Sequence, residues 1–327
     1  MKAALCTKPG RIEDVALGDV AEPACPTEGL LVRVHAAGVN FPDVLLVRGQ
    51  YQEKPALPFA PGLELAGVVE AVGPAARGFA IGDHVMAVVP HGGFAELCAV
   101  DAAHAYKLPR DVAFDEAAVL PVTYGTAYHA FAQRAQLQQG ETLLVLGAAG
   151  GVGLAAVELG RKFGARVIAV ASTAEKRAAA QSAGAHDTID QASEGLVDRV
   201  KALTGGKGAD VIFDPVGGDL FDQSLRCVAP EGRVLVIGFA SGRIGEVKAN
   251  RLLLKEYGVL GVYWGAFARR EPEQNRANFA RLIEWLRTGE LRPVIWKRFS
   301  LADVPAALAA LAERRVIGKA VIVVRET

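Results

Sequence analysis

The sequence predicts an α/β protein in which a doubly wound parallel sheet is joined to a second, irregular β domain. Apolar strands alternate with helical segments from about residue 123 to 262, as in a parallel sheet with helices on both faces. Residues 1–122 instead break into short strands that Gly and Pro separate. At 327 residues and 51% hydrophobic content, the chain is long and apolar enough for two such domains.

The first domain is expected to consist of short strands. Runs of apolar residues bounded by turn residues predict strands at 30–34, 65–69, 83–88 and 95–100. Between them lie Gly and Pro, which permit a positive φ or fix φ and therefore end a strand. The number of strands and turns predicts an irregular β domain over residues 1–122.

The second domain, residues 123–262, is expected to alternate strand and helix. Apolar runs of parallel-strand type occur at 143–146, 166–171, 187–189, 209–214, 233–238 and 259–263. Helical segments at 154–163, 173–183, 194–203 and 221–228 lie between several of them. Ligands of such sheets bind beyond the carboxyl ends of the strands. The loops at 214–218 and 238–241 should therefore line the ligand cleft, which makes Gly238 and Phe239 candidate binding residues.

Residues 263–327 are expected to return to the first domain. An amphipathic helix is predicted at about 274–288, a second helix at 304–312 and a final strand at 319–324. Tyr263 and Trp264 follow the last strand of the parallel sheet, where they could wall a nucleotide pocket or serve as interface or core aromatics.

Composition and charge exclude several classes of protein. The 36 basic and 36 acidic residues give a formal net charge of zero, which argues against a nucleic-acid surface. Neither a signal-peptide pattern nor an apolar run of membrane-spanning length occurs, so we expect a cytoplasmic protein. The four cysteines form no C-x-x-C pair, and the six histidines show no paired ligand spacing. No metal site is therefore predicted.

Glycines follow the first strand of the second domain in a pattern that suits a dinucleotide. Residues 148–153 fit A-x-G-x-x-G, with Ala148, Gly150 and Gly153 at the three fingerprint positions. Gly150 would let the backbone approach a pyrophosphate, and Gly153 would let the next helix pack closely. The alternative is a plain strand-to-helix turn. The strand before the pattern and the helix after it favour the nucleotide site, with contacts from Ala149, Gly150, Gly151, Val152 and Gly153.

The end of the next strand predicts which nucleotide is bound. An NAD-selective fold usually places Asp or Glu there to hold the ribose 2′-hydroxyl, whereas this chain has Ser172. Lys176 and Arg177 follow in the first turn of the next helix. A hydroxyl group with two nearby cations favours a 2′-phosphate, so the sequence predicts NADPH over NADH. Ordinary solvated helix residues are the alternative for Lys176 and Arg177.

Several segments match one family from end to end. These are 38–43 (GVNFPD) followed by 48–51 (RGQY), 61–67 (PGLELAG), the glycine loop at 148–153, and 318–321 (GKAV). On these segments the chain resembles the zinc-free quinone oxidoreductase (zeta-crystallin-like) branch of the medium-chain dehydrogenase/reductase superfamily. The resemblance implies a GroES-like catalytic domain, a Rossmann domain and commonly a homodimer through the last Rossmann strand. It also implies that Thr126 lies near the cofactor.

The chain departs from the zinc-dependent members of that superfamily. Asn40 stands where those enzymes have a Cys ligand, and Leu63 stands where they have a His ligand. Neither side chain suits such a zinc site, so alcohol oxidation through a zinc-bound alkoxide is not expected. Some relatives also hold the 2′-phosphate with a Tyr after the third Rossmann strand. Gln191 is at that place here, so the phosphate would depend more on Lys176 and Ser172.

Without a metal, hydride from NADPH needs an acceptor that is already electrophilic, such as a quinone or an enone. The protein must then position the acceptor and supply a hydrogen-bond or proton donor. Asn40 and Tyr51 are the candidates: the Asn40 amide could bind a carbonyl oxygen or the nicotinamide edge, and the Tyr51 phenol could donate. The alternatives are a turn-capping Asn40, which Asp43 could hold in place, and a rim aromatic at Tyr51.

Three functions remain open at this point. The leading one is an NADPH-dependent quinone or enone oxidoreductase that acts on a small molecule. The second is an enoyl thioester reductase, because related reductases have a Tyr donor in what looks like the place of Tyr51, and Arg243, Arg269 and Arg270 could bind a nucleotide tail. The third is a non-catalytic NADPH-binding or structural protein of the zeta-crystallin type.

Overall fold

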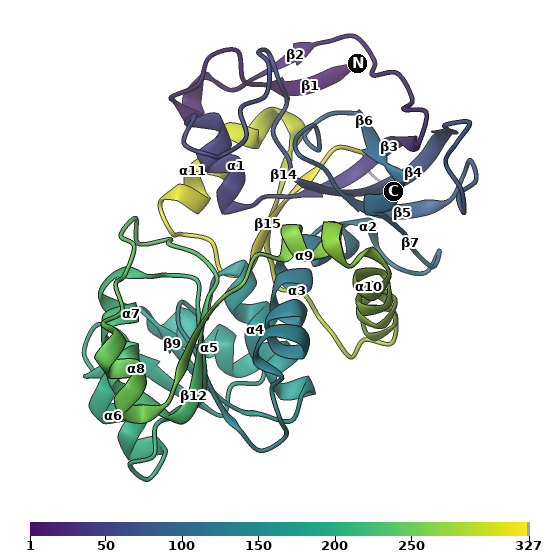
Figure 1. Cartoon of the computed structure of the whole chain (residues 1–327). Coiled ribbons are helices and arrows are strands. Elements are labelled where there is room, and N and C mark those ends of the chain that lie inside the picture. The colour runs from purple at the N-terminus through teal and green to yellow at the C-terminus, as the bar shows by residue number, and fades with distance from the viewer. Residues whose placement is uncertain (326–327) are drawn as a thin grey trace. The chain divides into compact units, whose positions relative to one another are not determined.

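The computed structural model describes residues 1–325, and the chain divides into two compact units (Figure 1). Unit 1 contains Met1–Val122 and the residues from Pro272 onward, and unit 2 is Thr123–Glu271. The second boundary falls nine residues after the expected one at 262/263. The ring of Phe267 stacks on that of His129 of unit 2, with ring centroids 4.0 Å apart, and this packing keeps the segment after the last parallel strand with unit 2.

Unit 2 contains a six-stranded, entirely parallel sheet. Its strands are β8 (Thr142–Val145), β9 (Arg166–Ala171), β10 (Asp187–Asp190), β11 (Ala209–Asp214), β12 (Val228–Val236) and β13 (Gly258–Gly261). The spatial order β10-β9-β8-β11-β12-β13 corresponds to 3-2-1-4-5-6, the doubly wound Rossmann order. The chain reverses direction across the sheet between β8 and β11, which is where such sheets bind their ligands. The predicted fold class is confirmed.

Helices cover both faces of this sheet (Figure 1). The helical segments of unit 2 are α3 (Leu120–His129), which crosses the unit boundary, the π-helical turn η3 (Ala130–Ala135), α4 (Gly151–Lys162), α5 (Ala174–Ser182), α6 (Leu196–Leu203), α7 (Gly218–Cys227), α8 (Ala249–Lys255) and α9 (Trp264–Arg270). Helix α4 lies close to the sheet because Gly153 and Gly160 have no side chain. A Cβ at Gly160 would lie 2.5 Å from Leu143 Cδ2 on β8.

Unit 1 is the irregular β domain that the sequence predicts. Its main sheet has the order β14-β15-β3-β4-β5-β7, with β6 also paired to β3, and β1 and β2 form a separate pair. Its strands are β1 (Lys2–Leu5), β2 (Ala16–Asp19), β3 (Gly29–Gly38), β4 (Glu64–Val72), β5 (His84–Val88), β6 (Leu97–Asp101), β7 (Ala105–Lys107), β14 (Ile295–Ser300) and β15 (Lys319–Val323). Strand β15 returns antiparallel to β3, which brings the C-terminal segment into the first domain.

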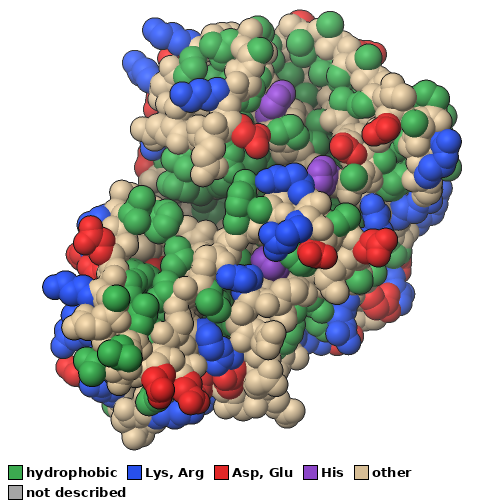
Figure 2. Space-filling model, in the orientation of Figure 1, with side chains coloured by type: hydrophobic (Ala, Val, Ile, Leu, Met, Phe, Trp, Pro, Cys, Tyr) green, Lys and Arg blue, Asp and Glu red, His purple; other side chains and the backbone are tan. Residues whose placement is uncertain are grey.

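The helices of unit 1 are short apart from one. They are α1 (Phe41–Val47), α2 (Phe114–Ala117), α10 (Pro272–Arg287) and α11 (Val304–Ala312), with 3-10 turns η1 (Ile12–Asp14), η2 (Ala102–His104) and η4 (Leu301–Asp303). No helix within residues 1–325 is long and apolar enough to cross a membrane. On the face drawn in Figure 2, Lys and Arg side chains are interspersed with Asp and Glu, in keeping with the formal net charge of zero.

Two histidines in unit 1 lie on one aromatic ring. His35 and His84 each pack against Phe114, with ring centroids 4.4 and 4.7 Å away. The Nδ1 atoms of both are buried, and neither has a hydrogen-bond partner within residues 1–325. Burial lowers the pKa of both histidines, and nearby Arg side chains lower it further. Both rings are therefore expected to be neutral at pH 7.

These histidines predict a loss of stability in acid. The unfolded chain binds protons on histidine near its ordinary pKa of about 6.5, whereas the folded protein resists protonation until a lower pH. The free energy of unfolding should therefore fall as the pH drops below about 6.5. We expect His84→Phe to reduce the difference between urea midpoints at pH 7.5 and 5.5. The other titrating groups contribute equally to wild type and variant, so comparing the two isolates the effect of His84. If the urea midpoint falls by the same amount between pH 7.5 and 5.5 in both proteins, this account is wrong.

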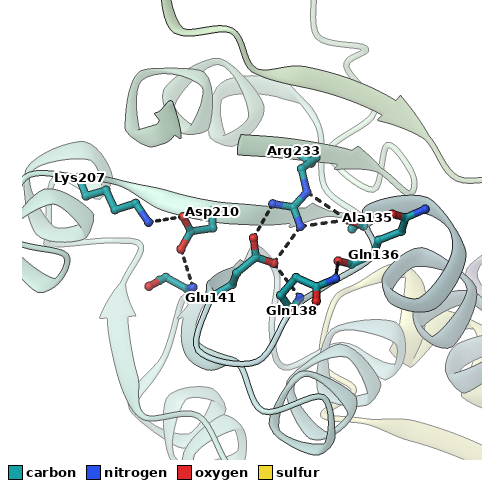
Figure 3. Close-up of polar contacts among 8 residues, drawn as sticks. Ala135, Gln136, Gln138, Glu141, Lys207, Asp210 and Arg233 are labelled. Carbon is teal, nitrogen blue, oxygen red and sulfur yellow. Dashed lines mark hydrogen bonds and ion pairs between the residues drawn. The ribbon is translucent and has the colours of Figure 1, made fainter. Parts of the chain in front are cut away.

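An ion-pair network lies at the amino ends of β8 and β11 and includes Arg233 of the neighbouring strand β12 (Figure 3). Arg233 donates to both carboxylate oxygens of Glu141, at 2.7 and 2.8 Å. It also donates to the carbonyl oxygen of Ala135, the last residue of η3. Lys207 pairs with Asp210 at 2.7 Å, and Asp210 accepts from Thr142 N. Only 21% of each of the Arg233 and Glu141 side chains is exposed, so this bidentate pair is shielded from water.

Arg233→Ala should lower the free energy of unfolding by about 2–3 kcal/mol, because it leaves Glu141 half-buried without its partner. Lys at this position keeps the charge but cannot make both bonds, so we expect a loss of about 1 kcal/mol for Arg233→Lys. Urea unfolding measures both losses. Because the network lies at the opposite end of the strands from the glycine loop, nucleotide affinity should not change. A variant as stable as wild type would contradict this account.

Candidate active site

The glycine loop lies between β8 and α4, at the switch point of the sheet. Gly147 has a φ of +57°, and a Cβ there would lie 2.8 Å from Val216 Cγ2 of the neighbouring loop. A Cβ at Gly153 would lie 2.4 Å from Gly147 O, whereas one at Gly150 would meet only Gly147 O, at 3.6 Å. The first turn of α4 is thus packed tightly on its inner side at Gly153, and Gly150 faces open space.

This arrangement fits a pyrophosphate. Gly150 is the N-cap of α4 and is exposed, and Gly151 and Val152 in the first turn are half-buried, whereas Ala149 and Gly153 are buried. The first N–H groups of an α-helix have no partner inside the helix, and its N-terminus carries a partial positive charge. The open space at Gly150 lets an anion approach these N–H groups. The loop therefore leaves room for a pyrophosphate, and the contacts expected of its residues stay predictions.

The predicted 2′-phosphate residues follow β9. Ser172 is exposed directly after the strand, and Thr173 caps α5 by accepting a hydrogen bond from Lys176 N at 3.2 Å. Lys176 lies half-buried in the first turn of α5. Arg177 forms an ion pair with Asp190 at the end of β10, at 3.0 Å. This ion pair neutralises part of the charge of Arg177.

Two further loops at the carboxyl end of the sheet are hydrogen-bonded to each other. Asp214 is buried and accepts from Val216 N and Gly217 N, which forms a tight turn after β11. Burial raises the pKa of Asp214, although the two backbone hydrogen bonds act in the opposite direction. The loop after β12 joins it through Ala240 N to Pro215 O and Ser241 N to Val216 O. Gly238 lies in this second loop, and Phe239 is 43% exposed there.

The remaining cofactor candidates of unit 2 differ in exposure. Thr126 is half-buried on α3. Tyr263 is 60% exposed after β13, with the guanidinium of Arg269 over its ring, whereas Trp264 is buried at the start of α9. The contacts predicted for these residues with a nucleotide stay predictions.

In unit 1, Asn40 lies between β3 and α1 in a buried polar cluster. Its Nδ2 donates to Glu64 Oε1 at 2.9 Å and to Gly38 O at 3.3 Å, and its Oδ1 accepts from Lys319 Nζ at 2.7 Å. Both amide hydrogens of Asn40 therefore already have acceptors. A hydrogen bond from this amide to a substrate oxygen would have to replace one of them, and the longer bond to Gly38 O is the weaker.

Asp43 holds the loop around Asn40, as the sequence suggests it could. It accepts from Asn40 N at 2.7 Å, which completes a capping box at the start of α1, and from Gly62 N at 2.9 Å. Burial raises the pKa of Asp43 to about 7, although these two donors and Lys319 act in the opposite direction. This carboxyl group is wholly buried and cannot contact a substrate directly.

Tyr51 lies in the turn after α1 and is half-buried against the apolar core of unit 1. Glu64 and Lys319 were not predicted as site residues. Both are buried and paired at 2.8 Å. In the sequence, each stands out only as a charged residue at the start of an otherwise apolar strand: Glu64 in 63–67 (LELAG) and Lys319 in 318–321 (GKAV). Such a residue is more often exposed at the strand end.

The comparisons with known proteins agree with this architecture. Residues 26–110 match the alcohol dehydrogenase GroES-like domain family, and residues 151–286 match the zinc-binding dehydrogenase family. The chain is 43% identical over 299 residues to a quinone oxidoreductase-like protein 2 homolog of Nematostella vectensis, covering 90% of this chain and 82% of the relative. A quinone oxidoreductase of Pseudomonas syringae pv. Tomato DC3000 is 33% identical, with a TM-score of 0.92 and 99% of both chains covered.

A second solved structure, Escherichia coli quinone oxidoreductase complexed with NADPH, is 28% identical, with a TM-score of 0.92 and coverage of 99% of this chain and 100% of that one. A parallel Rossmann sheet with a glycine-rich loop after its first strand, together with a GroES-like domain, defines an oxidoreductase of the medium-chain type. The chain belongs to the zinc-free quinone oxidoreductase branch of the medium-chain dehydrogenase/reductase superfamily.

The zinc in the description of one matching family does not suit the residues present. The family resemblance aligns Asn40 and Leu63 with metal ligands of the zinc-dependent enzymes, and the ammonium group of Lys319 contacts Asn40 Oδ1 at 2.7 Å. Among residues 1–325, no group of three or more His, Cys, Asp or Glu could hold a metal ion. No step of the chemistry below therefore uses a metal.

Proposed function

We propose that this protein uses NADPH to reduce a quinone or an activated enone without a metal ion. The observation behind the proposal is the ammonium group of Lys319, which lies 2.7 Å from Asn40 Oδ1 and 2.8 Å from Glu64 Oε1, the oxygen atoms that a metal ion at this place would need as ligands. An alcohol or unactivated carbonyl needs a metal ion or a general acid or base at its oxygen for hydride transfer, whereas a quinone or enone is electrophilic already.

Each unit contributes separate groups. The glycine loop and the first turn of α4 would bind the pyrophosphate, and Ser172 and Lys176 would bind the 2′-phosphate. When bound, NADPH supplies the hydride. Tyr51 would donate a hydrogen bond or proton to the oxygen of the acceptor as negative charge develops there. Asn40, held by Asp43 and Lys319, would position the reacting groups.

The enoyl thioester alternative has less support. Two of the three arginines that would bind a nucleotide tail have acidic partners: Arg243 pairs with Asp219 and Asp222 at 2.8 and 2.6 Å, and Arg270 lies 3.8 Å from Glu271, whereas Arg269 lies over the ring of Tyr263. A tail would have to compete with these contacts. Quinones and enones need no such groove.

Turnover tests the proposal. NADPH oxidation should be followed at the nicotinamide absorbance with benzoquinone, a naphthoquinone, a linear enone and crotonyl-CoA, with NADH as the control cofactor. We expect turnover with the quinones or the enone. Preference for crotonyl-CoA that Tyr51→Phe abolishes would instead indicate an enoyl thioester reductase, and binding of NADPH without any turnover would indicate the non-catalytic alternative. Tyr257→Phe is a matched control, because the buried Tyr257 hydroxyl has no hydrogen-bond partner within residues 1–325.

We also infer a homodimer. Strand β13 is the last in the order of the parallel sheet, so its outer edge can pair with the same edge of a second copy. Light scattering should give about twice the 34.4 kDa mass of the chain. A mass of one chain at micromolar concentration would contradict this. The cytoplasmic location of the protein stays a prediction.

A further inference from the structure

Lys319 is a cation enclosed by oxygen atoms inside unit 1. Its Nζ lies 2.7 Å from Val39 O, 2.7 Å from Asn40 Oδ1 and 2.8 Å from Glu64 Oε1. Only 6% of its side chain is exposed, and none of that of Glu64. An ammonium group has three hydrogens, so these three acceptors satisfy it completely.

The ammonium group determines how the Asn40 amide is oriented. Lys319 can only donate, so Asn40 must turn its Oδ1 toward Nζ. Its Nδ2 then faces Glu64 Oε1 and Gly38 O, both of which are acceptors. The Asn40 oxygen keeps one lone pair. In this orientation Asn40 is suited to accept a hydrogen bond, for example from a carboxamide N–H, and is not suited to donate to a quinone oxygen.

The same group balances buried negative charge. Glu64 Oε1 accepts from both Lys319 and Asn40, and Oε2 accepts from Val122 N at 2.8 Å in the first turn of α3. The backbone leaves room for this carboxylate, because a Cβ at Gly38 would lie 2.2 Å from Glu64 Oε1. Asp43 is buried in the same cluster. An unpaired carboxylate in this place would be strongly destabilising.

We propose that Lys319 is an internal cation that fixes the Asn40 amide with its oxygen available as an acceptor, and that it is thereby a positioning residue for hydride transfer. The effect of Lys319 on the rate of hydride transfer rests on the function proposed above. Its role as a buried cation that orients the Asn40 amide does not. Lys319 itself touches no substrate, since its three hydrogens are used within the unit.

Removal of the cation should affect stability and rate separately. Lys319→Ala leaves a space that a small alkylammonium ion can fill, and Lys319→Met fills the space without charge. Both should melt at a lower temperature than wild type. At a temperature where circular dichroism shows them folded, we expect kcat with a naphthoquinone to fall about tenfold or more, with KM for NADPH within about twofold, because NADPH affinity comes mainly from its phosphates.

Ethylammonium chloride should raise both the melting temperature of nucleotide-free Lys319→Ala and its kcat, whereas sodium chloride at equal ionic strength should not. Lys8→Met, at an exposed lysine of the same unit, is the control and should behave as wild type in either salt. If Lys319→Ala does not fold, Lys319→Met combined with Glu64→Gln removes both charges and should recover much of the lost melting temperature relative to Lys319→Met alone.

Three results would overturn the inference. They are a folded Lys319→Met variant with the wild-type kcat, a Lys319→Ala variant that ethylammonium does not stabilise, and a double variant no more stable than Lys319→Met. If the wild type turns over none of the acceptors, the proposed function fails. The melting temperatures of the nucleotide-free variants would still decide whether Lys319 is the internal cation.

Discussion

Replacing Gly153 with Ala is expected to destabilise the protein by about 2 kcal/mol and to abolish NADPH binding. The new Cβ would lie 2.4 Å from Gly147 O and 2.8 Å from Ala148 Cα. Both are backbone atoms, so α4 and the turn must move apart. Overpacking of this kind costs about 1–3 kcal/mol or more, and the gain of about 1 kcal/mol from Ala in a helix only partly offsets it. Urea unfolding and a fluorescence titration with NADPH measure the two effects.

Gly150→Ala is the matched control, because it should separate binding from folding. Its φ of −75° suits any residue, and its Cβ would meet only Gly147 O, at 3.6 Å. Stability should therefore stay within about 0.5 kcal/mol of wild type. NADPH affinity should nevertheless fall about tenfold or more, because the methyl group occupies the space that the pyrophosphate needs. Wild-type affinity in Gly150→Ala would contradict the assignment of this loop to the phosphates.

The second large effect is expected at Lys176. Lys176→Ala should weaken NADPH binding about 10- to 100-fold, which corresponds to the loss of about 1.5–3 kcal/mol in a charge-assisted hydrogen bond. NADH, which has no 2′-phosphate, should bind within about twofold of the wild-type affinity. Titration of both nucleotides measures the difference, and an equal loss for both would rule out the phosphate role of Lys176.

Arg177→Ala provides the comparison within the same helix. Its guanidinium is paired with Asp190 at 3.0 Å, so it has less charge to offer a phosphate. We expect a smaller loss of NADPH affinity than for Lys176→Ala. A larger loss would show that the ion pair opens when NADPH binds, and would assign the main phosphate contact to Arg177.

The sequence predicted the parts of the protein that depend on local signals. Strand β8, the glycine loop and helix α4 follow one another within Thr142–Lys162, and the close packing expected at Gly153 is reproduced by the backbone contacts that a Cβ would make there. Apolar runs likewise predicted all six parallel strands, although β12 begins at Val228 rather than at 233. Strand β3 extends to Gly38 past two register shifts, which apolar pattern alone does not reveal.

The cluster around Asn40 could not be predicted in the same way. Glu64 and Lys319 are 255 residues apart, and they meet because β15 pairs with β3 while β4 pairs with its other edge. That pairing depends on the whole topology of unit 1, and a single sequence gives no sign of it. The sequence predicted that the Asn40 amide binds a carbonyl oxygen or the nicotinamide edge, but it could not include Glu64 and Lys319, which determine how that amide is oriented. The unit boundary at Glu271 was missed for a similar reason, because it depends on the contact of Phe267 with His129.

The most direct test of the central claim is the rate of NADPH oxidation by a naphthoquinone after exhaustive treatment of the wild-type protein with a metal chelator. We predict the full rate, with no increase when Zn²⁺ is added back, because an ammonium group contacts Asn40 where a metal ion would need a ligand. Loss of turnover on chelation, with recovery on addition of Zn²⁺, would contradict it.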